Sequence, residues 1–175
     1  MPGYEPRVVE APFGTPLHRI VPLDGTSAVL LGGYHGTWLP TAEAALRTLD
    51  ATTMGAGVLA ALPADRCGLA ETARVLGYLA LQSAGQCGPC LNGLPRIAAA
   101  FQTLAATGPQ GTTRTDVSRW SGLVEGRGAC HHPDGTIRLV RSALTTFSAE
   151  LDAHAAGLCT ATDRTPLLPV PHEES

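Results

Sequence analysis

The sequence predicts an α+β fold, with a small mixed α/β unit over residues 1–65 and an all-helical unit over residues 66–158. Short apolar runs separated by glycine and proline characterise the first unit, whereas apolar residues at three- and four-residue spacing characterise the second. The chain also has only three Phe, three Tyr and two Trp among its 175 residues. Its core must therefore be built mainly from Ala, Leu and Val, which favours packed helices over a β-sandwich.

Two short apolar runs in the first unit predict buried strands. Residues 27–31 end at a glycine pair, and residues 55–62 precede Pro63. Between them, residues 41–49 predict a short helix. Residues 55–60 also fit the Gly-x-Gly-x-x-Ala pattern of dinucleotide-binding loops, but no helix opens there and Pro63 follows at once. We therefore interpret this segment as a strand.

Amphipathic helices are predicted in the second unit from the spacing of its apolar residues. Gly85 can end the first helix, and Pro95 can begin the second. Four helices are expected: from Cys67 to Gly85, from Pro95 to Ala105, from Asp116 to Leu123, and a long one through Ile137 and Leu151. Residues 159–175 are rich in proline and predict a disordered tail.

Composition and charge exclude several classes of function. The formal net charge is −3 and no basic stripe is present, so nucleic acid is not expected as a partner. No apolar run reaches the roughly 18 residues that a membrane-spanning helix needs. The first residues lack the features of a signal peptide, so we expect a cytoplasmic protein. In that compartment, five cysteines favour metal or redox chemistry over disulfides.

The Cys-Gly-Pro-Cys turn at Cys87 and Cys90 carries the most chemistry, and Cys130 lies forty residues on in a second glycine-rich turn. Thiolates in such turns bind metal while backbone N–H groups stabilise the sulfur charge, so we interpret the three cysteines as a metal site. A thioredoxin-like dithiol should follow a strand, whereas a helix precedes this turn and Gln86 replaces Trp. Leu91 replaces the His of a haem-attachment motif. An inert pair of buried cysteines is the remaining alternative.

Residues 83–93 are similar to the S-C-G-x-C-x-P-C-R-x-G segment of the NADH-binding flavoprotein subunit of respiratory complex I and of related hydrogenase and formate dehydrogenase subunits. Residues 32–39 also resemble the small ubiquitin-like domain of that family. The resemblance covers roughly residues 14–157. It implies a β-grasp unit of the SLBB type followed by a four-helix iron–sulfur binding domain.

The resemblance also implies a set of ligands. By position, Cys87, Cys90 and Cys130 match the second, third and fourth cysteine ligands of a 4Fe–4S cluster that takes electrons from flavin. Ala84 stands at the position of the first ligand and cannot bind iron, and Leu91 replaces the usual arginine. Three cysteines alone could hold a 3Fe–4S cluster, or a 4Fe–4S cluster with one open iron.

Another residue could replace the missing ligand. Cys159 is the leading candidate because a thiol beyond the last helix has little packing reason, and Cys67 is a second. His131 and His132 directly follow the third cysteine, and imidazole can bind iron or zinc. Three thiolates with one imidazole would also suit a zinc ion.

The resemblance predicts an iron–sulfur electron-transfer module of an NADH dehydrogenase-like flavoprotein system. The flavin and NADH segment of the family lies N-terminal to its ubiquitin-like part, so no FMN or NAD site is expected here. We expect a flavin-bearing donor subunit and an iron–sulfur acceptor protein as partners, no activity of the chain alone, and membrane association only through partners. The alternative is a non-catalytic interaction module with a structural zinc site or no metal.

Overall fold

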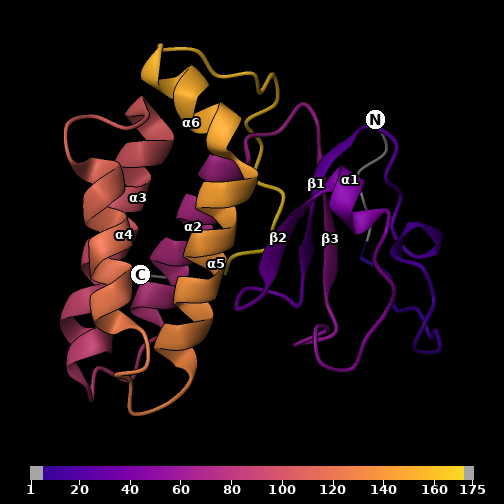
Figure 1. Ribbon diagram of the computed structural model, residues 1–175, viewed down its shortest axis with the longest axis horizontal. Helices are drawn as coiled ribbons and strands as arrows, with labels where there is room; N and C mark the ends of the chain where they lie inside the picture. The colour runs from indigo at the N-terminus through magenta and orange to yellow at the C-terminus, as the bar shows by residue number, and fades with distance from the viewer. Residues whose placement is uncertain (1–5, 172–175) are drawn as a thin grey trace.

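A three-stranded antiparallel sheet and a bundle of helices lie side by side in the computed structural model, which describes residues 6–171 (Figure 1). The strands are β1 (Thr26–Leu31), β2 (Thr37–Pro40) and β3 (Leu59–Pro63), in the order β2-β1-β3. This mixture of helices and sheet confirms the predicted α+β class. The ends of the predicted first unit and tail, residues 1–5 and 172–175, lie outside the described residues.

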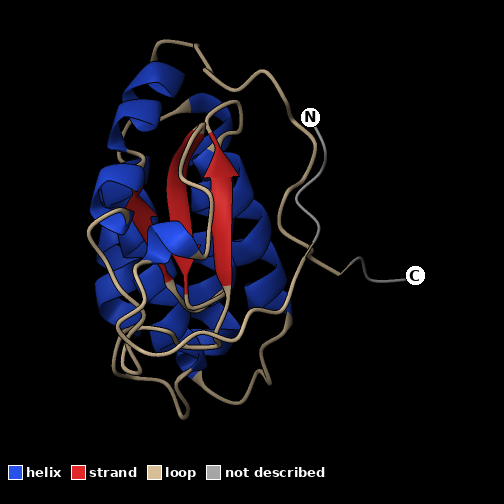
Figure 2. Cartoon of the chain, turned by 90° about the vertical axis from the view of Figure 1, so that its right-hand side faces the viewer, coloured by secondary structure: helices blue, strands red, loops and turns tan. Residues whose placement is uncertain are grey.

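Strand β1 lies at the centre of the sheet and is buried on both faces. Ala28 and Leu30 belong to the large core that the sheet shares with the helices. Val29 and Leu31 belong to a smaller core on the opposite face, as the two-residue period of a strand requires. Loops cross that outer face in Figure 2, where the sheet lies in front of the helices.

The helix predicted over residues 41–49 is shorter than expected. Helix α1 covers only Thr41–Ala44, and Thr48 then forms an antiparallel bridge with Pro16. This partner is distant in sequence, so a tertiary contact outweighs the local helix propensity. A short 3-10 helix, η1 (Leu17–Arg19), follows the bridged segment.

The helical unit contains one more break than its periodicity predicts. Phe147 divides the long last helix in two, because its ring packs against Trp38 with centroids 5.2 Å apart and fills the space over Gly68. The helices cover Gly68–Leu81 (α2), Leu94–Thr107 (α3), Thr113–Val124 (α4), His132–Thr146 (α5) and Ser148–Ala155 (α6), with a π-helical turn, η2, at Pro89–Gly93.

Helix α5 joins the two units by covering the edge strand β2. The Trp38 backbone N–H donates to Ser142 Oγ at 3.0 Å, and Thr146 Oγ1 donates to the Trp38 carbonyl at 3.0 Å. Both main-chain groups of Trp38 thereby have hydrogen-bond partners. At an open sheet edge, such groups would bind solvent or another strand. The bundle therefore holds a fixed position against the sheet.

The segment after Cys159, which we expected to be disordered, contacts the bundle in its described part. It forms no helix or strand up to residue 171, but Leu168 is only 5% exposed and joins the large core. The buried carboxylate of Glu71 accepts the backbone N–H groups of Leu167 and Leu168 at 3.0 and 3.1 Å. These contacts return the chain along α2 toward the sheet (Figure 1).

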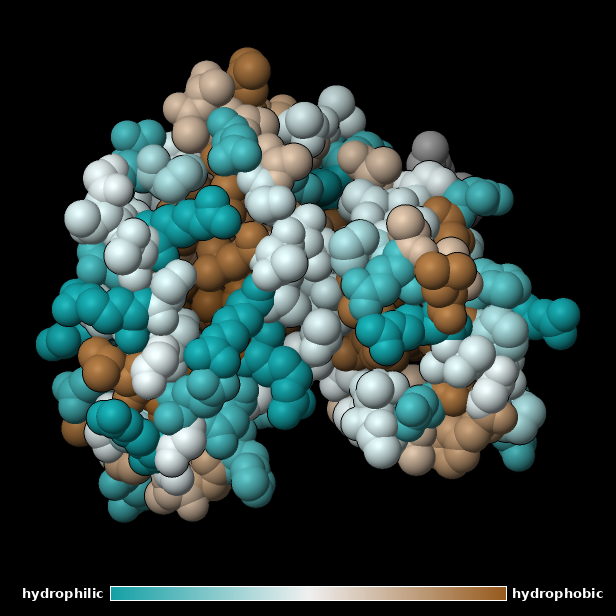
Figure 3. Space-filling model, in the orientation of Figure 1, coloured by the Kyte–Doolittle hydropathy of each residue, from teal (hydrophilic) through white to brown (hydrophobic). Residues whose placement is uncertain are grey.

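The face of the molecule drawn in Figure 3 is hollowed over the helical half. The hollow has an apolar floor and a hydrophilic rim. Among the described residues, no helix has both the length and the hydrophobicity needed to cross a membrane.

Candidate metal centre

The turn that follows α2 places two of the predicted cysteines. Gly85 adopts a positive φ of 62° after the helix ends, and the backbone N–H of Leu91 donates to the carbonyl of Cys87 at 2.9 Å. Cys90 lies in the π-helical turn η2 and is only 4% exposed, whereas Cys87 is half-buried. Such π turns are rare and are frequent at functional sites. A helix, not the strand of a thioredoxin-like setting, precedes the pair.

The third predicted cysteine comes to the same end of the bundle. Cys130 is exposed and lies just before α5, in a loop tied down by a hydrogen bond from the Gly126 N–H to Asp134 Oδ1 at 2.8 Å. Gly128 is required there, since a Cβ would approach the Cys130 carbonyl oxygen to 2.7 Å. The loop directs the N–H of Ala129 at the sulfur of Cys87, so the two turns meet.

The environments of the paired thiols differ. Backbone N–H groups of Ala129 and Cys90 point at the sulfur of Cys87 and lower its pKa. Burial raises the pKa of Cys90 to about 11, and the hydrogen bond to Cys87 and the charges of Cys87 and Cys130 add to the effect. Without a cation, Cys87 is thus the more acidic thiol of the pair, and Cys90 keeps its proton at neutral pH. A bound metal would supply the charge that lets the others ionise.

The three sulfur atoms are near one another but are spread out. Within residues 6–171, one group of three or more His, Cys, Asp or Glu residues has all its donor atoms within 4.8 Å of one another, and these three cysteines do not form it. Ligands of a single ion must converge in that way. Thiolates of an iron–sulfur cluster bind different irons, so they lie farther apart. The three thiols therefore come to one end of the bundle without converging on a single point in this structure.

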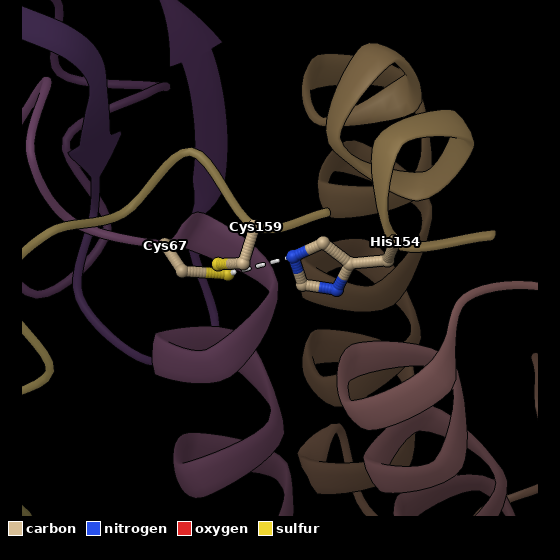
Figure 4. Close-up of side chains that lie close together, drawn as sticks. All are labelled: Cys67, His154 and Cys159. Atoms are coloured by element: carbon tan, nitrogen blue, oxygen red, sulfur yellow. Dashed lines mark hydrogen bonds between the residues drawn. The ribbon is translucent and has the colours of Figure 1, made fainter. Parts of the chain in front are cut away.

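Cys159 does not lie with these three residues, which corrects its prediction as their fourth ligand. The donor atoms of Cys159, Cys67 and His154 all lie within 4.8 Å of one another, at the N-terminal end of α2 (Figure 4). The 14 residues of α2 separate this group from the Cys87 turn, which corresponds to about 20 Å of helix. Helix α5 carries the chain to that end, where Phe147 packs over Gly68 at the start of α2. Cys67 is excluded as the fourth ligand for the same reason.

The two histidines after Cys130 have different roles. His132 contacts the Leu79 carbonyl through Nε2 at 2.9 Å, and its ring meets the edge of His35 with centroids 5.0 Å apart. It therefore fixes the start of α5 against the end of α2. His131 is exposed and is adjacent in sequence to Cys130, so it remains the candidate imidazole ligand at this end.

A groove beside the cysteine turn adds positive charge. It has a volume of about 280 Å³, and Gly88, Arg96, Trp120 and Arg127 are among the residues that line it. Arginine side chains near thiolates offset their negative charge. The predicted site thus combines a thiol pair and a third thiol at one end of the bundle, and two arginines line the adjoining groove.

Sequence reasoning missed one potential ligand, His154. It is buried in the last turn of α6 and lies with Cys67 and Cys159 at the other end of the bundle. The sequence does contain a sign of it: Glu150 and His154 are four residues apart, so they share one face of a helix.

The fold and these cysteines define an α+β protein with a candidate cysteine-ligated metal centre. Residues 70–154 match the family model of the NADH-ubiquinone oxidoreductase-F iron-sulfur binding region. The match confirms the resemblance predicted from the cysteine motif. It spans helices α2 to α6 and includes Cys87, Cys90 and Cys130.

Two solved structures share the fold. A crystal structure of NAD+-reducing NiFe-hydrogenase in the H2-reduced state superposes with a TM-score of 0.78 at 24% identity, covering 87% of this chain and 28% of that one. The air-oxidized state gives a TM-score of 0.67 at 24% identity, covering 81% and 24%. The chain thus spans about a quarter of the length of these structures. No match was found among curated proteins.

Proposed function

We propose that the chain is an iron–sulfur electron-transfer module of an NADH dehydrogenase-like flavoprotein system. One observation carries the proposal: the region that matches the iron–sulfur binding family is also the region that brings Cys87, Cys90 and Cys130 to one end of the bundle. When bound there, a cluster supplies a one-electron carrier.

The protein's own groups would hold the cluster and tune it. Cys87, Cys90 and Cys130 would each bind one iron, and the N–H groups of Ala129 and Cys90 would donate to the sulfur of Cys87. Hydrogen bonds to sulfur and burial both adjust the potential of such clusters. We propose a 4Fe–4S cluster whose fourth iron faces the position of Ala84, with His131 or an exogenous molecule as its ligand. A 3Fe–4S cluster is the alternative.

The proposed system extends beyond this chain. A flavin-bearing donor subunit would supply electrons, and an iron–sulfur protein would accept them. The hydrogenase of the similar structures is named as NAD+-reducing, which agrees with a flavoprotein setting. The sheet unit would correspond to the SLBB-type β-grasp domain of that family, packed on the bundle through α5. We place the module in the cytoplasm.

The experiment is anaerobic reconstitution of the full chain with iron and sulfide. Stoichiometric iron and acid-labile sulfide, lost in Cys87→Ala, Cys90→Ala or Cys130→Ala, would support the proposal. Cys159→Ser is the matched control, because it removes an exposed thiol at the other end of the bundle. An EPR signal of the oxidised protein would identify three irons, and one that appears only on reduction would identify four.

Two outcomes would contradict the proposed iron–sulfur function. Zinc bound by Cys87, Cys90 and Cys130, with a featureless visible spectrum, would favour a structural zinc site. A protein that takes up neither metal at these residues would favour a non-catalytic interaction module. The replacement of the first family ligand by Ala84 is the observation that keeps this second function in view.

A further inference from the structure

A compact group of three possible metal ligands lies at the end of the bundle opposite the Cys87 turn. Cys67 immediately precedes α2, His154 is on α6, and Cys159 follows α6. In Figure 4 their side chains point toward one another from these three segments. Their donor atoms all lie within 4.8 Å of one another. Cys67 and Cys159 lie outside the residues that match the iron–sulfur family model, and His154 is the last residue of that match.

We propose that Cys67, His154 and Cys159 bind a zinc ion. Zn–S bonds of about 2.3 Å and Zn–N bonds of about 2.0–2.1 Å place sulfur and nitrogen about 3.6 Å apart in a tetrahedral site. Cys67 Sγ and His154 Nε2 are 3.7 Å apart. Two thiolates and an imidazole are ligands that zinc accepts and that magnesium and calcium avoid.

The surroundings of Cys67 support a cation. The Ala70 N–H at the start of α2 donates to Cys67 Sγ at 3.4 Å, which stabilises a thiolate. Glu150 Oε2 lies 3.5 Å from the same sulfur and accepts the Gly68 N–H at 3.1 Å. Two thiols and a carboxylate thus meet at one place, and a divalent ion there would be held by ligands of opposite charge.

The positions of His154 and Glu150 fit this role. His154 is 7% exposed, an unusual burial for an imidazole that has no ion pair among the described residues. Glu150 precedes it by one helical turn and holds the N-terminus of α2, so it fixes α6, and with it His154, against Cys67. We assign Glu150 as a positioning residue for the site.

The site also has an entry path and a free coordination position. A cavity of about 660 Å³ borders it, with Arg66, Glu71 and Gln110 among the other lining residues. Cys159 is exposed at its rim. Three protein ligands leave the fourth position of a tetrahedral zinc ion facing this space, where water completes the shell. The bound ion would fasten the segment after α6 to the start of α2.

Zinc and cobalt binding tests the proposal in the full-length chain. Cys87, Cys90 and Cys130 are first replaced together by Ser, so that the predicted cluster site cannot contribute. This protein should bind about one zinc ion per chain, and Co²⁺ should give the intense near-ultraviolet absorption of thiolate ligation. Its melting temperature should rise when zinc is added. Iron and sulfide loading of the unsubstituted chain is measured separately, so failure of either site is seen by itself.

Cys159→Ser is the decisive variant because Cys159 is exposed and its replacement should leave the fold intact. Loss of a residue that hydrogen-bonds to a metal ligand lowers metal affinity by roughly 10- to 100-fold. Loss of the ligand Cys159 should therefore lower zinc affinity at least as much, and it should weaken the cobalt–thiolate band. Glu150→Gln should weaken binding by roughly 10- to 100-fold while the band persists. Circular dichroism checks the fold of each variant.

Three outcomes would overturn the proposal. The first is zinc affinity that is unchanged by Cys159→Ser. The second is the absence of zinc and cobalt binding in a folded, reduced protein. The third is a Cys67–Cys159 disulfide in protein purified under reducing conditions, detected as a mass lower by two hydrogens, because that bond would consume both thiolates.

Discussion

The two ends of the helical bundle both gather cysteines, but they do so in different ways. At one end, Cys87, Cys90 and Cys130 come from two glycine-containing turns, and backbone N–H groups point at sulfur. At the other end, Cys67 and Cys159 approach an imidazole and a carboxylate, with three donor atoms within 4.8 Å. The sulfur atoms of the first set do not converge on one point, whereas the donor atoms of the second set do.

This difference indicates which kind of metal each end suits. An iron–sulfur cluster spreads its charge over several irons and sulfides. Hydrogen-bond donors to its sulfur atoms therefore matter more than ligand atoms that meet at one point. A single zinc ion needs convergence, and it tolerates a nearby carboxylate because its own charge is positive. Cysteine count alone would not separate the two ends, but spacing and neighbouring charge do.

The largest expected effect comes from Gly68→Ala, which should damage only the convergent end. A Cβ at Gly68 would overlap the ring of Phe147, the residue that turns the chain from α5 into α6. Overpacking of this kind costs about 3 kcal/mol at its upper range. Because α6 carries His154, zinc binding should fall with stability, while the Cys87 turn keeps its iron. Urea unfolding and metal analysis measure both.

Gly77→Ala is the matched control in the same helix. The nearest atom to a Cβ at Gly77 is the flexible amide of Gln102 at 3.4 Å. Replacing a helical glycine there should stabilise the protein by about 0.5–1 kcal/mol and leave both metals bound. Equal losses in the two variants would show that the Phe147 contact does not position α6.

Glu71→Ala should have the next largest effect. Its buried carboxylate accepts the N–H groups of Leu167 and Leu168 and pairs with Arg74 at 2.9 Å. Hydrogen bonds to a charged group contribute about 1.5–3 kcal/mol, so a loss of about 2 kcal/mol is expected. Release of this segment should expose it to limited proteolysis and weaken zinc binding by Cys159.

The control for that variant is Glu43→Ala, because Glu43 forms an exposed ion pair with Arg47 at 2.6 Å. Exposed pairs contribute at most about 0.5 kcal/mol on a helix. If thermal unfolding and proteolysis change equally in the two variants, the buried carboxylate does not anchor the segment.

Thiol reactivity should separate Cys87 from Cys90 by about tenfold in the metal-free, reduced protein. The pKa of Cys87 is lowered and that of Cys90 is raised to about 11, so near pH 8 Cys87 has much the larger thiolate fraction. Nucleophilicity falls with pKa and offsets about half of that advantage on a logarithmic scale, which leaves roughly a tenfold difference in rate. Iodoacetamide labelling with peptide fragmentation measures the order.

The pH dependence has a definite sign. Cys90 is a thiol below pH values near 11 and becomes a thiolate as the pH rises toward that value. The rate ratio should therefore narrow as the pH increases, and it should vanish in urea, where both thiols are exposed. Faster labelling of Cys90 in the folded protein at pH 8 would contradict the hydrogen bonds assigned to Cys87.

Much of the bundle could be predicted because apolar spacing reports directly on the buried face of a helix. The strands β1 and β3 likewise follow from short apolar runs. The break at Phe147 could not be predicted, since the spacing continues through it and the cause is a contact with Gly68. Similarly, Thr48 leaves the helical pattern because its partner, Pro16, is far away in sequence.

The position of Cys159 could have been predicted better from the sequence. Cys130 precedes the long last helix that the sequence predicts and Cys159 follows it, so the prediction itself places the two at opposite ends of a rod. About 24 helical residues would span about 35 Å, too far for two ligands of one site. What sequence could not supply is which other residues meet Cys159, because Cys67 and His154 arrive from different helices.

Ala84→Cys should give the smallest effect and the sharpest view of the spread end. The residue is exposed in the turn between α2 and the thiol pair, and our proposal assigns it the position of the family's first ligand. A thiolate there would bind the iron that our proposal leaves open, so the cluster should survive several-fold longer in air. A cluster of three irons in the parent protein should gain a fourth, visible in the EPR spectrum of the reduced variant.

Ser83→Cys, one residue earlier in the same turn, is the matched control. If both variants, or neither, prolong the cluster, position 84 does not face the open corner. Zinc at the convergent end should be unchanged in all three proteins, because α2 separates it from this turn.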